Sequence, residues 1–359
     1  MIKLFQPYVS QKARDNVLRV LSGNQLAQGP EVELFEQEFA DKFGYQKWQI
    51  VSLNSGTSAL ELAYQLTGIG EADEVITPVL TCTATNVPLV RLKAHAIFAD
   101  IEGKNHLNID SDDVLDKITE STRAIVFVHF GGSSEGLSEI EEVCEQHDID
   151  LICDAAQALG NELSTKARFN CISLQAIKSL TAGDGGILIC RDREDADKAR
   201  KLRWFGYDRE KKQKEGDCDL ELAGYKMHMN DINAAIARGN LADWDEIFEH
   251  RRAINEIYYE AWKNSRGNAL KLIPGIWNPQ VIMHEYIELH PSPEIWAEEL
   301  GFEIGQYHFP NYKYSIFRSF SGHTPNMHRM EKNYFILPCH MGMTLDDARL
   351  IAKTLWPKN

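Results

Sequence analysis

The sequence predicts an α/β fold in which a large domain, built on a mostly parallel central sheet with flanking helices, precedes a smaller C-terminal α+β domain. In the first two thirds of the chain, short apolar β-branched segments alternate with segments that carry apolar residues at helical spacing. Such alternation is typical of a parallel sheet that helices cover on both faces. Near Asn230 the pattern changes to one long helical segment followed by mixed strand and helix signals.

The expected elements of the large domain follow one another in regular order. Apolar residues at helical spacing predict helices within residues 11–23, 30–44, 57–68, 84–93, 137–148 and 194–206. Runs of β-branched residues predict strands within residues 49–56, 73–78, 95–101, 124–132, 149–156 and 185–192. Pro30 stands where a first-turn proline begins a helix.

The second part of the chain is expected to form a separate unit. Residues 230–264 have the pattern of one long helix or of two in series. After them we expect strands within 280–289 and 302–308, and helices within 292–301 and 344–356. We place the boundary near residue 240, which gives domains of residues 1–240 and 241–359, and expect the long helix to bridge them.

Composition narrows the classes of function. The net charge of −15, from 38 basic and 53 acidic side chains, argues against a nucleic-acid partner. The seven cysteines are scattered without a CxxC pair, which indicates a reducing compartment and no metal site. The chain shows neither a signal-peptide pattern nor a run of about 18 apolar residues, so we expect a cytoplasmic protein with no membrane partner.

Polar residues follow the first strand in the segment NSGTSAL. Ser55, Gly56 and Thr57 lead directly into a helix. Free N–H groups in the first turn of a helix favour an anion, and a glycine lets a ligand approach the backbone. The segment is therefore either a phosphate cradle or an ordinary Ser/Thr helix cap.

Asp154 and Gln157 follow a later strand in the segment DAAQALG. Asp154 stands at the end of that strand, and open α/β sheets bind ligands beyond the carboxyl ends of their strands. Taken alone, Asp154 is more simply explained as the cap of the segment after it.

Lys178 lies in SLQAIKSLTAGDGG, five residues after Ser173 and just before a glycine-rich turn. Taken alone it is a surface lysine, whereas a desolvated lysine is a nucleophile for carbonyl groups. The order of the three features favours a cofactor site for pyridoxal 5'-phosphate (PLP). PLP needs an anion site for its phosphate, a carboxylate for its pyridinium nitrogen and an amine for its Schiff base.

These motifs, with GNQLAQGPEVELFEQEFA, DEVITPVLTCTATN, GYKMHMNDINAAIA, HFPNYKYSIF and LPCHMGM, resemble the DegT/StrS family of PLP-dependent sugar aminotransferases. The likeness covers most of the chain and implies the fold-type I architecture of PLP enzymes. It implies that an amino group moves, usually from glutamate, to a keto group of a nucleotide-linked sugar, for amino-sugar and surface-polysaccharide biosynthesis. It also implies a homodimer with each active site at the subunit interface.

The resemblance assigns roles by position. Lys178 matches the Schiff-base lysine and proton carrier, and Asp154 matches the partner of the pyridine nitrogen. Gln157 matches the residue beside the cofactor ring. The residues that match phosphate binders are Gly56, Thr57 and Ser173. A further candidate for the same site is Ser55, which precedes Gly56 in its turn.

Three departures from the family pattern stand out. Cys82 occupies the position of an aromatic residue that stacks on the cofactor. Lys226 replaces an asparagine that reaches the cofactor phosphate of the neighbouring subunit, and His228 replaces an arginine. The region from about 265 to 305 is short, so we expect a trimmed small domain.

Other residues are candidates for substrate contacts. Arg203 could bind the donor carboxylate or the substrate phosphates, or belong to a packed loop. His308 and Tyr312 could face the substrate. His129 could lie near the cofactor or be a core histidine, and the charged run 208–217 is expected to be a solvated loop.

Two alternative functions stay open. A related subgroup has histidine in place of the lysine and dehydrates its sugar, so a PLP-dependent sugar dehydratase is one alternative, against which Lys178 argues. The other is a non-catalytic PLP-fold regulator or scaffold, although the chain shows no basic tail and no helix-turn-helix extension.

Overall fold

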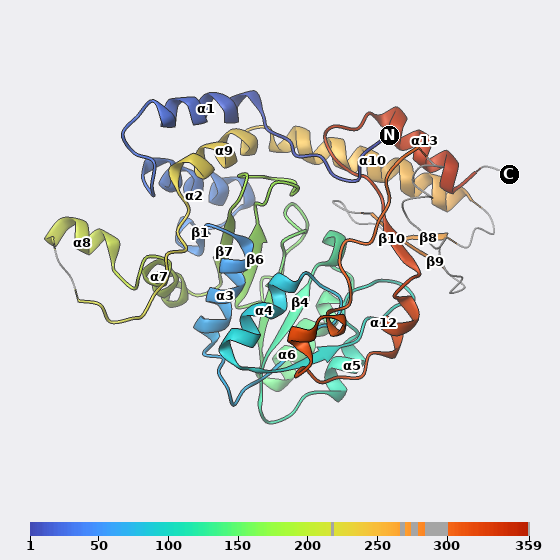
Figure 1. Ribbon diagram of the computed structural model, residues 1–359, viewed down its shortest axis with the longest axis horizontal. Helices are drawn as coiled ribbons and strands as arrows, with labels where there is room; N and C mark the ends of the chain where they lie inside the picture. Colours follow the sequence, from blue (N-terminus) through green and yellow to red (C-terminus); the bar gives the residue numbers. More distant parts are fainter. Residues whose placement is uncertain (217–218, 266–269, 274–278, 284–300, 358–359) are drawn as a thin grey trace.

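A seven-stranded sheet lies at the centre of the larger part of the molecule (Figure 1). Its strands have the spatial order β1-β7-β6-β5-β4-β2-β3. Along the chain they are β1 (Ile50–Leu53), β2 (Glu74–Pro78), β3 (His95–Ala99), β4 (Thr122–Val128), β5 (Asp150–Asp154), β6 (Phe169–Ser173) and β7 (Gly186–Cys190). β7 is antiparallel to β1 and β6 and every other neighbouring pair is parallel, so the predicted mostly parallel sheet is confirmed.

The computed structural model describes residues 1–216, 219–265, 270–273, 279–283 and 301–357. The helix expected within 292–301 lies almost wholly outside these residues, and so does the second half of the strand expected within 280–289. Most of the region expected to be trimmed lies outside them as well.

Helices cover both faces of the sheet. On one face α3 (Gly56–Thr67) and α7 (Arg193–Leu202) share a core with Val51, and on the other α2 (Pro30–Phe43) and α9 (Asp231–Leu241) share a core with its neighbour Ile50. α6 (Leu137–His147) packs on the second face through Ile140 and Val143. The helices of this part are α1 (Gln11–Leu21), α2 (Pro30–Phe43), α3 (Gly56–Thr67), α4 (Thr83–Leu92), α5 (Ser111–Asp116), α6 (Leu137–His147), α7 (Arg193–Leu202), α8 (Arg209–Glu215) and α9 (Asp231–Leu241).

A three-stranded antiparallel sheet of order β10-β9-β8 organises the C-terminal part. Its strands and helices are β8 (Leu270–Ile273), β9 (Gln280–Met283), β10 (Tyr334–Ile336), α10 (Trp244–Asn264), α12 (Pro325–Met330) and α13 (Leu345–Leu355). α10 connects two cores, because Trp244 packs with the large sheet and Tyr258 packs with α13. The division at residue 240 stays a prediction.

The structure decides one open alternative and corrects two local expectations. Residues 230–264 form two helices in series, with α9 ending at Leu241 and α10 beginning at Trp244. Residues 302–308 form no regular strand but make isolated bridges, such as the one between Gly305 and Ile336. The run expected to be a loop contains α8, which starts where the Asp208 side chain accepts a hydrogen bond from the Lys211 N–H.

No helix in the described part of the chain combines the length and the apolar character that a membrane crossing requires.

Candidate active site

The carboxyl ends of β1, β2, β4, β5 and β6 lie at one edge of the large sheet, because these strands run in the same direction. This is the edge where open α/β sheets bind ligands. The predicted cofactor residues Asp154 and Ser173 are the last residues of β5 and β6. The predicted phosphate turn at Gly56 follows β1 directly.

Lys178 lies in a turn beyond the end of β6, where its backbone N–H donates to the Gln175 carbonyl at 2.8 Å. Its Nζ donates to the Tyr307 hydroxyl at 3.0 Å. Within the described ranges, no carboxylate lies within ion-pair distance of this amine. The turn therefore presents a half-buried amine at the sheet edge, held by a neutral partner.

Asp154 is a buried carboxylate, 4% exposed. Its Oδ2 accepts from the Thr85 hydroxyl at 2.7 Å, and its Oδ1 accepts from the Ala156 N–H at 3.1 Å. Burial raises the pKa of Asp154, while these two hydrogen bonds and the positive charge of Lys178 oppose that rise. A buried carboxylate without an ion-pair partner among the described residues suits a cationic ring nitrogen.

Gln157 and His308 come together near Lys178, whose charge acts on His308. The Gln157 Oε1 accepts from the Gly131 N–H at 2.9 Å, and its Nε2 lies 3.4 Å from the His308 Nε2. Burial, with a smaller effect of the nearby Lys178 charge, lowers the pKa of His308 to about 3, so its imidazole is neutral near pH 7. The structure thus brings His308 into the same cluster as the predicted cofactor residues.

The start of α3 and the end of β6 approach each other closely. A Cβ atom on Gly56 would lie 2.9 Å from the Ser173 Cβ, so only glycine fits there without a shift. Ser55 caps α3, since its Oγ accepts from the Ser58 N–H at 3.1 Å, and Thr57 lies in the first turn. The first-turn N–H groups and the Ser173 side chain therefore lie close enough to form one anion cradle.

Cys82 lies at the N-cap of α4. Burial raises the pKa of its thiol, and the charges of Asp154 and Lys178 also act on it, which places it near both. Lys226 pairs with Trp204 in an isolated bridge, and its Nζ lies 5.9 Å from the centre of the Phe205 ring. No contact in the described residues joins Lys226 to the cluster around Lys178.

Arg203 is 5% exposed, and its guanidinium is engaged inside the protein. It donates to the Glu36 carboxylate at 2.6 Å and to the Ser52 carbonyl at 2.8 Å. Of the two expectations for Arg203, these contacts favour the packed loop, because a buried ion pair occupies the side chain, and a substrate contact by Arg203 stays a prediction.

Tyr312 and His129 have different surroundings. The Tyr312 hydroxyl donates to Glu331 at 2.8 Å, and its ring stacks on His328 at 4.6 Å, so it stays a predicted substrate contact without a link to Lys178. His129 is fully buried, and its ring meets the Phe127 ring edge-on with the ring centres 5.0 Å apart. Burial lowers the pKa of His129 to about 4.

Thr85 and Tyr307 are site residues that sequence reasoning missed. Thr85 lies one helical turn after Cys82 in the segment that follows β2, and this spacing is the one local signal that could have found it. Tyr307 precedes His308, but nothing in the sequence indicates that it meets Lys178. Both contacts depend on how distant segments pack.

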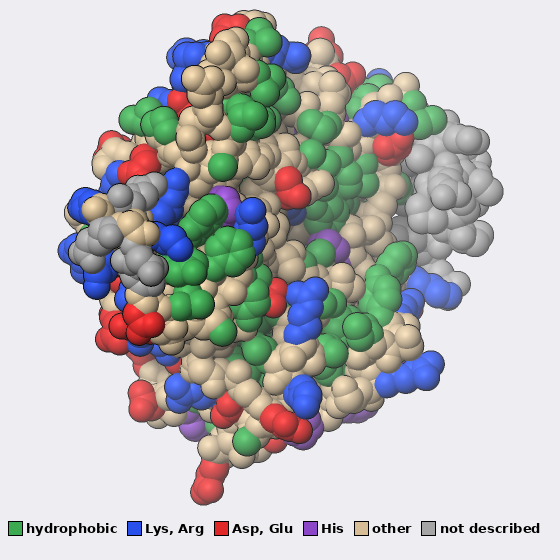
Figure 2. All heavy atoms as spheres, turned by 60° about the vertical axis from the view of Figure 1, so that its left-hand side comes forward, with side chains coloured by type: hydrophobic (Ala, Val, Ile, Leu, Met, Phe, Trp, Pro, Cys, Tyr) green, Lys and Arg blue, Asp and Glu red, His purple; other side chains and the backbone are tan. Residues whose placement is uncertain are grey.

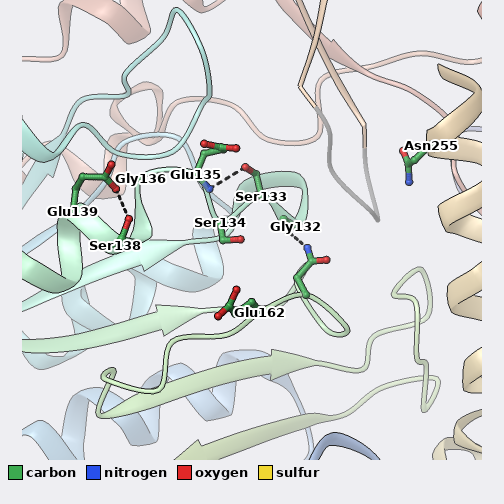
Figure 3. Close-up of a pocket in the computed structure, with 10 residues that line it drawn as sticks. Gly132, Ser133, Ser134, Glu135, Gly136, Ser138, Glu139, Glu162 and Asn255 are labelled. Atoms are coloured by element: carbon green, nitrogen blue, oxygen red, sulfur yellow. Dashed lines mark hydrogen bonds between the residues drawn. The ribbon is translucent and has the colours of Figure 1, made fainter. Parts of the chain in front are cut away.

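A separate hollow of about 400 Å³ is lined by the segment that begins at Gly132 (Figure 3). Figure 3 shows Asn255 of α10 on the opposite side from Glu135 and from Glu139 of α6. The complete lining is Gly132, Ser133, Ser134, Glu135, Gly136, Ser138, Glu139, Asn161, Glu162 and Asn255. Its three carboxylates make it unsuitable for phosphate groups.

The residues at the sheet edge fit PLP. The cradle at Gly56 and Ser173 suits the phosphate, the buried Asp154 suits the ring nitrogen, and the Lys178 amine suits the aldehyde.

Comparisons with known proteins identify the same class of enzyme. The model of the DegT/DnrJ/EryC1/StrS aminotransferase family matches residues 7–356. Similar curated proteins include the dTDP-4-dehydro-2,3,6-trideoxy-D-glucose 4-aminotransferase of Saccharopolyspora spinosa, 29% identical over 98% of this chain and 94% of that protein. Another is the spore coat polysaccharide biosynthesis protein SpsC of Bacillus subtilis (strain 168), 34% identical over 77% of this chain and 70% of that protein.

Among solved structures, AtS13 from Actinomadura melliaura superposes with a TM-score of 0.90 at 29% identity, covering 99% of this chain and 98% of that one. The sugar aminotransferase CalS13 from Micromonospora echinospora has a TM-score of 0.89 at 28% identity, covering 99% of both chains. These matches confirm the predicted fold class, enzyme class and PLP cofactor. The protein belongs to the DegT/DnrJ/EryC1/StrS aminotransferase family, whose members are PLP-dependent.

Proposed function

We propose that this protein transfers an amino group, with L-glutamate as donor, to a keto group of a nucleotide-linked deoxysugar in amino-sugar or surface-polysaccharide biosynthesis. The observation that carries the proposal is that the Lys178 amine and the buried Asp154 carboxylate both lie at one edge of the sheet. The similar protein from Saccharopolyspora spinosa is named as an aminotransferase of a dTDP-linked keto-deoxysugar, which supports the substrate class.

Bound PLP supplies an electron sink for the bond that breaks at the amino-bearing carbon. Asp154 would accept a hydrogen bond from the protonated ring nitrogen, and Thr85 opposes the rise in the pKa of that carboxyl group. Lys178 would hold the cofactor through its Nζ, which is also the group at this point of the site that can hold and move a proton. Gly56 and Ser173 would hold the phosphate end.

The lysine favours aminotransfer over the dehydratase alternative. The Lys178 amine can hold a proton and pass it on, and aminotransfer would require an enzyme base of this kind at the point where the cofactor is held.

A homodimer is part of this proposal. The face on the α8 side carries hydrophobic side chains with basic ones between them (Figure 2). Exposed large apolar residues of the chain include Phe205 (41%), Leu220 (49%), Phe309 (50%) and Ile316 (52%). Exposed apolar patches mark interaction surfaces. We propose that Lys226, beside Phe205, reaches the cofactor phosphate of the partner subunit.

The test is a screen of nucleotide-linked keto sugars with glutamate, read by mass spectrometry of the sugar product and by the visible band of the cofactor. We expect the band to shift with glutamate and the product to gain one amino group. Lys178→Ala, as the matched control, should fold, hold no covalent cofactor and form no amino sugar. A band that glutamate, glutamine and aspartate all leave unchanged would contradict the proposal, and a keto-deoxysugar formed without donor consumption would favour the dehydratase.

A further inference from the structure

The Tyr307 hydroxyl is the hydrogen-bond partner of the catalytic amine. Lys178 Nζ donates to it at 3.0 Å and lies 5.2 Å from the centre of its ring. In the part of the chain that the structure describes, this is the one side-chain hydrogen bond of either group. None of the proposed roles of Asp154, Thr85 or Gly56 accounts for this contact.

Packing on two sides fixes the Tyr307 ring. The Phe5 ring meets it edge-on at 5.2 Å, and the His308 ring does so at 4.2 Å. The first residues of the chain run beside this segment, since Ile2 bridges to Phe302. Phe5 therefore packs against Tyr307 from an N-terminal segment that is attached to the same part of the protein through the bridge between Ile2 and Phe302.

Asn311 attaches the same segment to the start of α4. Its side chain is fully buried and donates to the Thr81 carbonyl at 2.8 Å, and its Oδ1 accepts from Asn86 at 2.9 Å. Thr81 in turn lies 2.7 Å, oxygen to oxygen, from the Thr85 hydroxyl that bonds Asp154. The segment with Tyr307 and the loop beside Asp154 are thus one connected hydrogen-bonded structure.

We propose that Tyr307 is a positioning residue that holds the Lys178 amine at the point where it meets the cofactor. This rests on the proposed function only in that Lys178 reacts with PLP. A free lysine side chain loses rotamer entropy when it is fixed, and a standing hydrogen bond offsets part of that cost. A phenol hydroxyl suits this task because it can accept a hydrogen bond from an ammonium group and can donate one to a neutral amine.

The first test measures how fast the protein freed of cofactor captures added PLP, a reaction in which the Lys178 nitrogen bonds to the aldehyde carbon and one water leaves. The variants are Tyr307→Phe, which removes only the hydroxyl, and Phe5→Ala, which removes the ring behind it. Tyr8→Phe is the matched control, because it also deletes a tyrosine hydroxyl that bonds a charged side chain, Asp243 at 3.0 Å.

We expect Tyr307→Phe to slow capture by roughly 3- to 10-fold, the equivalent of one hydrogen bond. Phe5→Ala should slow it in the same direction, and Tyr8→Phe should stay within twofold of the wild type. Slowing of less than threefold in Tyr307→Phe overturns the proposal. Capture needs neither donor nor sugar, so a failed sugar screen leaves this result intact.

The second test separates positioning from general damage. In the half-reaction with α-deuterated glutamate, a misplaced Nζ should slow proton transfer itself. Tyr307→Phe should therefore lower kcat and raise the deuterium isotope effect, with the KM for glutamate within twofold of the wild type. An unchanged isotope effect with a lower melting temperature would assign Tyr307 a structural role and overturn the proposal.

Discussion

Thr85 donates a hydrogen bond to the buried carboxylate of Asp154 at 2.7 Å. Together with the Ala156 N–H, it supplies the neutral hydrogen bonds that oppose the effect of burial on that group. In the proposed site an ionised Asp154 would keep the cofactor ring protonated, so Thr85 would act on the chemistry through the protonation of its neighbour.

Thr85→Val should slow the donor half-reaction by about 10-fold, the effect of losing one hydrogen bond to a charged group. Burial raises the pKa of Asp154 and Thr85 lowers it, so its loss raises that pKa further. The acid limb of the pH profile of kcat/KM should therefore move to higher pH. Thr85→Ser, which keeps the hydroxyl, should restore the wild-type profile, and an acid limb unmoved in Thr85→Val would contradict this role.

Gly56→Ala should weaken PLP binding, because the added Cβ would lie 2.9 Å from the Ser173 Cβ and push α3 away from β6. We expect the dissociation constant of PLP to rise by about 10-fold, roughly 1.4 kcal/mol. Equilibrium titration of the cofactor-free protein measures it. Gly70→Ala is the control, since its Cβ would meet nothing nearer than 3.8 Å. Equal dissociation constants for the two variants would show that the phosphate lies elsewhere.

Arg203→Ala should cost about 3–5 kcal/mol of unfolding free energy, because it leaves the buried Glu36 carboxylate without its ion-pair partner. Urea unfolding measures this loss. Arg91→Ala, which removes a 57% exposed partner of Glu61, should cost less than about 1 kcal/mol. In the folded Arg203→Ala enzyme the KM values for donor and sugar should be unchanged. A KM raised by tenfold or more would indicate that Arg203 contacts the substrate.

His129→Gln should make the stability of the protein less sensitive to acid. Burial lowers the pKa of His129 from 6.5 to about 4, so below pH 6.5 the unfolded chain binds a proton that the folded protein excludes. Stability is therefore lost as the pH falls from 6.5 towards 4, by about 2 kcal/mol at pH 5 from this residue.

Urea unfolding should be measured at pH 7.5 and at pH 5. The loss of unfolding free energy between these two pH values should be smaller in His129→Gln than in the wild type, by about 2 kcal/mol. Burial also lowers the pKa values of His308 and His228. Both residues are present in the variant and in the wild type, so their contributions to the pH dependence cancel in the comparison. The same pH difference in variant and wild type would indicate that His129 binds its proton in the folded state.

The candidate residues that sequence reasoning could place at the sheet edge are those that stand next to the end of a strand. Asp154 and Ser173 end parallel strands, so the direction of the sheet brings them to one edge without further information. Lys178 follows the same edge, and Gly56 begins the helix after β1. Periodicity and chain order were enough for these positions.

The residues that it missed or misjudged depend on partners far away in the chain. Arg203 looks like a binding residue in its loop, and only the folded protein shows that Glu36 occupies it. Tyr307 meets Lys178 because the C-terminal part folds back over the sheet edge. α8 was missed because its charged residues give no apolar period, although Asp208 supplies a helix cap.

The placement of α10 has a consequence for how the protein unfolds. One continuous helix carries Trp244 in the core of the large sheet and Tyr258 in the C-terminal core. Neither core can come apart while the helix stays intact and packed in the other, so the two should melt as one cooperative unit. Calorimetry should record a single heat-absorption peak, and a stabilising ligand at the sheet edge should raise the melting temperature of the C-terminal part together with that of the rest.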